Sequence, residues 1–214
     1  MLTRTALLVA LALPLTSSCQ GAYYSGLEAF GIHKRDVFVD RVEDARDAQA
    51  DAKEAFVSTL AAFRAVSDFD GGSVEDLYQD LDERYRDCAS RAAAVDSRID
   101  GVTSVSKALF EEWETEISEI SDAGLRSMSQ QRLDQARGRY SSLVTAMRAA
   151  ESRMQPVLTA FKDRVLFLKH DLNAQAIASL AGTLGEIEID VDQLIGEMES
   201  AIAEADALIA TIGN

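Results

Sequence analysis

Apolar residues recur along most of the chain at alternating steps of three and four positions. Such series run through residues 38–66, 74–120, 133–168 and 177–212. Steps of three and four keep one face of an α-helix apolar over many turns, whereas a half-buried strand needs strict alternation of apolar and polar residues, which these series lack. The pattern therefore predicts an all-α protein built from long helices.

Three short segments interrupt the series and predict turns between helices: 68–72, 121–124 and 170–173. Ser73 and Asn173 are the expected N-caps after the first and third segments, and Ser127 with Gln130 has the spacing of a capping box after the second. Helices of about 40–48 residues would be roughly 60–70 Å long. Because short turns make successive helices antiparallel, we predict an elongated up-down-up-down antiparallel four-helix bundle or coiled coil, with two separate helical hairpins as the alternative.

The first 18 residues are typical of an export signal. Arg4 precedes an apolar run from Ala6 to Leu15, which suffices for a signal but falls short of the roughly 20 residues that a membrane-spanning helix needs. The run leads through small residues to Cys19, and this arrangement resembles a bacterial lipobox, where the signal is cut before the cysteine and the cysteine is acylated. The alternative is an ordinary secretory signal followed by an incidental cysteine.

This N-terminal pattern divides the chain into three regions. We expect a signal peptide over residues 1–18, a lipidated Cys19 with a tether over residues 19–30, and a single helical-bundle domain over residues 31–214. The residue after the cysteine is Gln20 and not aspartate, and in this respect the chain resembles lipoproteins that are sorted to the outer membrane. The predicted location is the periplasmic face of the outer membrane, and a soluble periplasmic protein is the alternative.

Charge differs between the predicted helices. The whole chain carries 36 Asp and Glu against 21 Lys and Arg, and its net charge of −15 argues against nucleic acid as a partner, because phosphate contacts need clustered cations. Residues 123–170 hold nine Lys and Arg and three acids, whereas residues 171–214 hold nine acids and no Lys or Arg. In the predicted bundle the one basic helix therefore lies between two acidic ones.

Two interpretations of this partition are open. In the first, arginines of the basic helix pair with acids across helix edges and select the order of the helices. These arginines are Arg132, Arg137, Arg139, Arg148 and Arg153. In the second, the last helix presents carboxylates to a cationic partner or to divalent ions. These carboxylates are Glu186, Glu188, Asp190, Asp192, Glu197 and Glu199, and their spacing does not match a calcium loop built around a tight turn.

Common catalytic motifs are missing from the sequence. It contains no phosphate-binding Gly-x-x-x-x-Gly-Lys-Ser/Thr loop, no His-Glu-x-x-His zinc motif and no Gly-x-Ser-x-Gly nucleophile motif. His33 and His170 lack the preceding glutamate of a di-iron bundle and are expected at opposite ends of the molecule. Cys88 falls on an apolar helix face, where a buried thiol is the usual case. We therefore predict no enzyme activity, no cofactor and no metal site.

Short strings near both ends of the predicted mature chain resemble one protein family. They are Ala22-Tyr23-Tyr24, Gly31-Ile32-His33-Lys34-Arg35-Asp36 and Lys169-His170-Asp171-Leu172-Asn173. Over nearly all of the predicted mature chain, the sequence is similar to proteobacterial secreted proteins that form a domain-of-unknown-function family. The resemblance implies an exported helical protein of Gram-negative bacteria that often carries a lipobox and has no assigned activity.

Together these features predict a non-enzymatic lipoprotein that is anchored to the outer membrane through Cys19 and acts as a helical scaffold or adaptor in the cell envelope. The expected partners are the membrane and an envelope protein, with neither nucleotide nor nucleic acid. The alternative is a soluble periplasmic binding or chaperone-like module that uses the acidic last helix.

Overall fold

The computed structural model describes residues 33–68 and 71–212. Its elements in chain order are α2 (Lys34–Ala65), the 3₁₀ turn η1 (Val66–Asp68), α3 (Val74–Glu119), α4 (Ala123–His170), α5 (Ala174–Gly182) and α6 (Leu184–Ile212). No strand occurs in these two ranges, so the predicted all-α fold class is confirmed. The predicted signal peptide, Cys19 and the tether over residues 19–30 lie outside the described residues.

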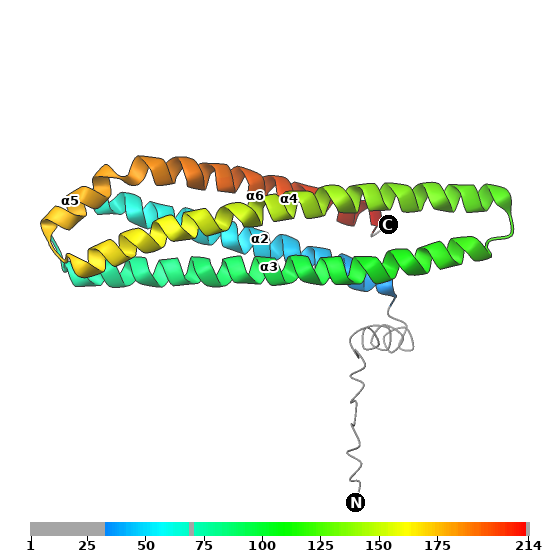
Figure 1. The fold of residues 1–214 in the computed structure, drawn as a ribbon, viewed down its shortest axis with the longest axis horizontal. Coiled ribbons are helices and arrows are strands. Elements are labelled where there is room, and N and C mark those ends of the chain that lie inside the picture. Colours follow the sequence, from blue (N-terminus) through cyan, green and yellow to red (C-terminus); the bar gives the residue numbers. More distant parts are fainter. Residues whose placement is uncertain (1–32, 69–70, 213–214) are drawn as a thin grey trace, which may run out of the picture.

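The four long helices lie side by side along a rod-shaped body (Figure 1). α2 packs against α3 and α6, and α4 packs against the same two helices. The short helix α5 packs against η1 at one end of the rod, where it connects α4 to α6. At the other end, the turn between α3 and α4 extends beyond the start of α2 and the end of α6 (Figure 1).

The core runs along the inner faces of the helices at the spacing that the sequence predicts. In α6 the buried residues are Leu184, Ile187, Val191, Leu194, Met198, Ala201, Ala205, Leu208 and Ile212. Aromatic rings concentrate at two levels of the rod. Phe161 of α4 stacks on Phe63 of α2 with ring centroids 5.2 Å apart, and Phe38 of α2 contacts Phe110 and Tyr140 nearer the other end. The apolar face of each long helix is therefore covered by its neighbours.

The predicted helix starts are confirmed at two positions and wrong at a third. The side chain of Ser73 accepts a hydrogen bond from the N–H of Asp76, and that of Asn173 accepts one from Ala176, so both residues are N-caps. The capping box at Ser127 is not the start of α4. The helix begins earlier because Asp122 accepts the N–H of Leu125 at 2.8 Å, and its carboxylate also interacts favourably with the positive end of the helix dipole.

The predicted last helix is divided into α5 and α6 at Thr183. The hydroxyl and the N–H of Thr183 both donate to the carbonyl of Leu180. These bonds compete with the hydrogen bonds that would continue the helix. Gly182 and Gly185 flank Thr183, and glycine lowers helix stability by about 1 kcal/mol relative to alanine. The carbonyl of Thr183 accepts a hydrogen bond from Arg164 of α4 at 2.8 Å, so the interruption leaves this acceptor satisfied.

Candidate functional site

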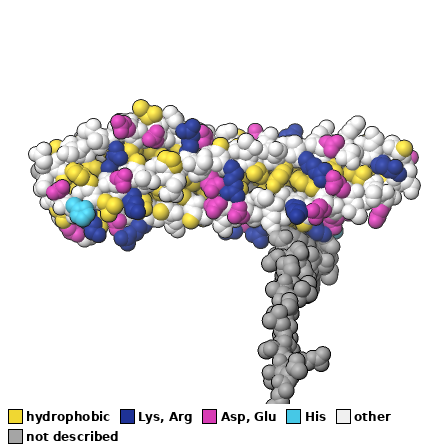
Figure 2. Space-filling view, in the orientation of Figure 1, with side chains coloured by type: hydrophobic (Ala, Val, Ile, Leu, Met, Phe, Trp, Pro, Cys, Tyr) yellow, Lys and Arg dark blue, Asp and Glu magenta, His cyan; other side chains and the backbone are white. Residues whose placement is uncertain are grey.

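Ion pairs cross each of the four boundaries between packed long helices. Lys34–Glu112, Asp44–Arg98 and Asp51–Arg91 join α2 to α3; Arg46–Asp206, Lys53–Glu199 and Arg64–Glu188 join α2 to α6; Arg137–Glu114 and Arg148–Asp96 join α3 to α4; and Arg153–Glu197 joins α4 to α6. Figure 2 shows side chains of opposite charge next to one another along the visible face. Such exposed pairs contribute about 0–1 kcal/mol each, so they bear more on which helices meet than on overall stability.

The basic helix α4 provides three of the five predicted pairing arginines. Arg137 contacts Glu114 at 2.6 Å, and Arg148 contacts Asp96 at 2.7 Å and also Asp100 and Glu151. The hydrogen bond to Glu151, followed by those to Asp96 and Asp100, raises the pKa of Arg148 above its usual value, while partial burial lowers it. Arg153 pairs with α6, as described above. The remaining two, Arg132 and Arg139, form no ion pair with a residue that the structure describes.

The six carboxylates predicted as a partner surface lie on different sides of α6. Glu188 and Glu199 pair with α2, whereas Glu197 pairs with α4. The other three are exposed to solvent: Glu186, Asp190 and Asp192. Half of the predicted set therefore takes part in contacts between helices, and an acidic surface for a partner remains a prediction for the other half.

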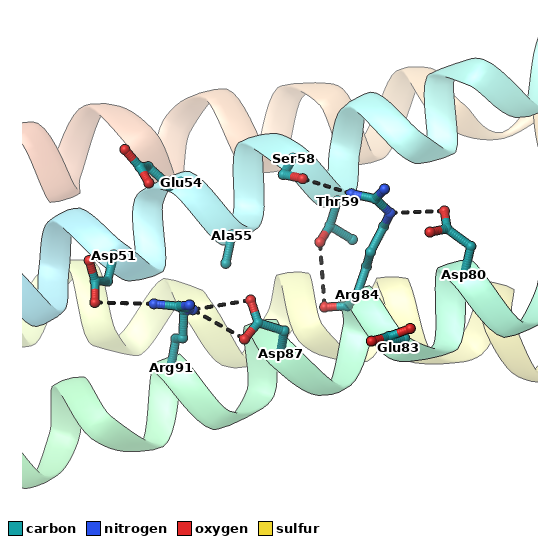
Figure 3. A pocket seen from close by; sticks show the side chains of 10 residues that line it. All are labelled: Asp51, Glu54, Ala55, Ser58, Thr59, Asp80, Glu83, Arg84, Asp87 and Arg91. Carbon is teal, nitrogen blue, oxygen red and sulfur yellow. Dashed lines mark hydrogen bonds and ion pairs between the residues drawn. The ribbon is translucent and has the colours of Figure 1, made fainter.

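A shallow groove of about 450 Å³ lies between α2 and α3 (Figure 3). Its charged side chains mostly satisfy one another. Arg91 contacts Asp51 and Asp87, both at 3.1 Å, and the guanidinium of Arg84 contacts Asp80 of its own helix and the hydroxyl of Ser58. The hydrogen bond that Arg84 donates to Asp80 raises the pKa of Arg84, and the bonds that Arg91 donates to Asp87 raise the pKa of Arg91.

The groove is lined by carboxylates but, among the described residues, holds neither a histidine nor a metal-binding cluster. Glu54 and Glu83 line it without an ion pair to any described residue, and no histidine reaches it. Across residues 33–68 and 71–212, no group of three His, Cys, Asp or Glu side chains is placed to hold a metal ion. His33 immediately precedes α2 without a side-chain capping hydrogen bond, and His170 ends α4, at opposite ends of the rod, as predicted. The two histidines therefore lie too far apart to act together at one site.

Cys88 lies in the core behind this groove. Its side chain has no exposed surface, and its sulfur lies 3.1 Å from the hydroxyl oxygen of Thr59 on α2. Burial raises the pKa of the Cys88 thiol from its ordinary value of 9.0 to about 11, although the hydrogen bond with Thr59 acts in the opposite direction. The thiol is therefore neutral and inaccessible at physiological pH.

We expect native Cys88 to resist alkylation near pH 8 and to react at the rate of a free thiol only in denaturant, because the reactive species is the exposed thiolate. The unfolded thiol ionises near pH 9 while the folded one stays neutral up to about pH 11, so the contribution of this site to stability should be complete below pH 9 and lost between the two values. Resistance to alkylation is measured by iodoacetamide labelling of the Cys19→Ser variant, in which Cys88 is the sole cysteine. Rapid labelling without denaturant would contradict the burial.

A buried polar residue that the sequence did not indicate lies on the apolar face of α2. Gln49 has no exposed surface, and neither its Oε1 nor its Nε2 has a hydrogen-bond partner among the described residues. The apolar series of α2 continues through Ala48 between Ala45 and Ala52, and Ala48 packs against the core. Gln49 therefore left no gap in the sequence pattern, and its burial became visible only once the helices were packed.

Within the described ranges, the fold defines an all-α protein of long helices that are linked by charged pairs across their boundaries, and none of its helices combines the length and the apolarity needed to cross a bilayer. The chain belongs to the family described as Protein of unknown function (DUF2959), whose model matches residues 23–212. The resemblance of its terminal strings to a domain-of-unknown-function family is thus confirmed. No curated protein and no solved structure matches the chain.

Proposed function

We propose that this protein is a lipoprotein anchored to the periplasmic face of the outer membrane, where its helical body serves as a non-enzymatic scaffold or adaptor. The observation that carries the proposal is the position of Cys19, which follows residues typical of an export signal and precedes the first long helix by a short segment. Acyl chains contribute about 0.8 kcal/mol per buried CH₂, and stable anchoring takes more than one chain. A cysteine acylated on both its thiol and its amine supplies them without a membrane-spanning helix.

We also propose that the helical body is an up-down-up-down antiparallel four-helix bundle. Supporting this topology, α2, α3, α4 and α6 pack in a closed ring, with each helix beside its neighbours in sequence. Opposite charges at each boundary favour this order over alternatives that place the acidic α3 beside the acidic α6. A rod with charged pairs across every boundary between its long helices is a suitable spacer between a membrane anchor and a second envelope protein.

The proposal is tested by the intact mass of the protein purified from membranes of its native host. The expected mass is that of residues 19–214 plus a diacylglyceryl group and one further acyl group. In the Cys19→Ser variant, cleavage and acylation should both fail and the full-length precursor should accumulate. Cys88→Ser is the matched control, and it should be processed like the wild type.

Two results would argue against the anchor. One is processing that continues in the presence of globomycin, which blocks cleavage of lipoprotein signals. The other is an unmodified mass in the soluble periplasm, and this result would favour the soluble binding module instead. Exposed Asp190 and Asp192 on α6 would then be the first residues to neutralise in a binding assay.

A further inference from the structure

The hairpin of α3 and α4 extends past the other long helices at one end of the rod (Figure 1). Lys34, the first residue of α2, contacts Glu112 of α3 at 2.8 Å, so residues 113–119 lie beyond the start of α2. This part of α3 is about 10 Å long at 1.5 Å per residue. We refer to residues 113–130, which include the turn and the first part of α4, as the hairpin tip.

The hairpin tip carries two large apolar side chains that no other part of the described molecule covers. Leu125 is 59% exposed and Met128 is 54% exposed. They lie three positions apart on α4 and therefore share one face of the helix. Nearby, the indole N–H of Trp113 donates to the hydroxyl of Ser129 at 3.2 Å, so the single tryptophan of the chain lies within one turn of Met128.

We propose that the hairpin tip rests on a lipid surface and inserts Leu125 and Met128 among the headgroups. This inference rests on the proposed anchor. A fully extended chain from Cys19 to Lys34 reaches about 50 Å at most, so acyl chains on Cys19 hold this end of the rod close to the bilayer. The exposed apolar residues Phe167 and Leu172 lie at the opposite end, beyond the 32 residues of α2. The hairpin tip is therefore the apolar surface closest to the membrane.

The charges of the hairpin tip indicate which kind of lipid surface it fits. Glu116, Glu119 and Asp122 are exposed, while the guanidinium of Arg126 donates to the carbonyl of Ile120 at 2.9 and 2.6 Å. Clustered cations, which draw proteins to anionic lipid, do not occur among these groups. Insertion of the apolar pair therefore accounts for the contact, and zwitterionic headgroups suit it better than anionic ones.

The fluorescence of Trp113 tests the proposal. Acylated protein is reconstituted into phosphatidylcholine vesicles whose acyl chains carry bromine close to the headgroups. Side chains at an interface enter the boundary of headgroups and acyl chains, so we expect Trp113 emission to fall about two-fold relative to vesicles without bromine. The Leu125→Glu/Met128→Glu variant should lose this quenching while it still sediments with the vesicles.

A charge-matched control separates the hairpin tip from the rest of the surface. Leu172→Glu/Ile189→Glu also places two carboxylates at exposed apolar positions, but away from the hairpin tip, and it should be quenched like the wild type. Circular dichroism of both variants checks that they remain folded.

A second preparation replaces the acyl anchor: residues 19–214 carry an N-terminal hexahistidine and are bound to nickel-chelating lipid. It tests the hairpin tip even where the anchoring of Cys19 has failed.

Several results would refute lipid contact by the hairpin tip. If wild-type protein sediments with the vesicles but its Trp113 emission is not quenched, lipid contact by the hairpin tip is refuted, whereas the anchor at Cys19 is not. Equal quenching of the wild type and the hairpin-tip variant would place the contact elsewhere. Stronger quenching on anionic than on zwitterionic vesicles would show that basic residues carry it. A shift of Trp113 emission that depends on protein concentration, without vesicles, would instead indicate contact with a second copy of the chain.

Discussion

Replacing Phe161 with alanine is expected to lower the free energy of unfolding by about 3–5 kcal/mol, because it removes a large buried side chain and leaves a cavity. Phe161 has no exposed surface. Its ring lies 5.2 Å from that of Phe63 and 6.1 Å from that of Phe56, so one substitution removes contacts between α4 and two positions on α2. These rings lie across the bundle from one another, and their loss affects the packing of the whole layer.

Phe167 provides a matched control on the same helix. It is also a phenylalanine of α4, but 41% of its surface is exposed, so Phe167→Ala should cost less than Phe161→Ala by at least about 2 kcal/mol. Urea unfolding followed by circular dichroism measures both variants, and equal slopes of free energy against denaturant would show that the comparison is valid. Equal losses in the two variants would contradict the position of Phe161 in the core.

The second large effect is a gain of stability. Gln49→Met is expected to raise the free energy of unfolding by about 1–3 kcal/mol, because burying an amide without hydrogen-bond partners carries a desolvation cost that a thioether of similar volume avoids. Both amide atoms of Gln49 lack a partner among the described residues, and the side chain is fully buried. A polar residue at one position of an apolar seam favours one arrangement of helices at a cost in stability.

Thr59→Val is the comparison that isolates the effect of the missing partners. Thr59 is also polar and buried on α2, but its hydroxyl contacts the sulfur of Cys88 at 3.1 Å. Removing a hydroxyl that has a partner should lower stability by about 0.5–1.5 kcal/mol, the opposite sign from Gln49→Met. The same unfolding measurement distinguishes them. If Gln49→Met were destabilising, Gln49 would have contacts that compensate for its burial.

The arrangement of apolar residues predicted most of the helical body. Spacings of three and four placed the buried face of α6 correctly from Leu184 to Ile212, since this periodicity depends only on the geometry of the helix. Local hydrogen-bonding capacity predicted the caps at Ser73 and Asn173. It failed at Ser127 because the helix already begins at Ala123, where Asp122 accepts the N–H of Leu125, so Ser127 lies inside α4. It also missed the interruption at Thr183, where the carbonyl acceptor is satisfied by Arg164 on another helix.

The candidate surfaces were less predictable than the helices. The sequence identified arginines on one helix and acids on its neighbours, but not which partners meet, because an ion pair between helices depends on their packing and register. Arg137 and Arg148 find partners on α3, whereas Arg132 and Arg139, on the same helix, find none among the described residues. The six carboxylates of α6 lie within 14 residues of sequence, yet the structure directs Glu188 and Glu199 toward α2 and Glu197 toward α4.

By itself, the sequence determined the helical class, the apolar faces and the partition of charge, because each depends on composition or on local periodicity. It also predicts an export signal before Cys19. The tertiary structure decided what depends on distances between helices. It left Gln49 buried without a partner, placed the thiol of Cys88 against Thr59, and extended Leu125 and Met128 beyond the cover of α2 and α6. Burial of a side chain is a property of its neighbours as well as of its own residue type, so these features appear only once the helices are packed.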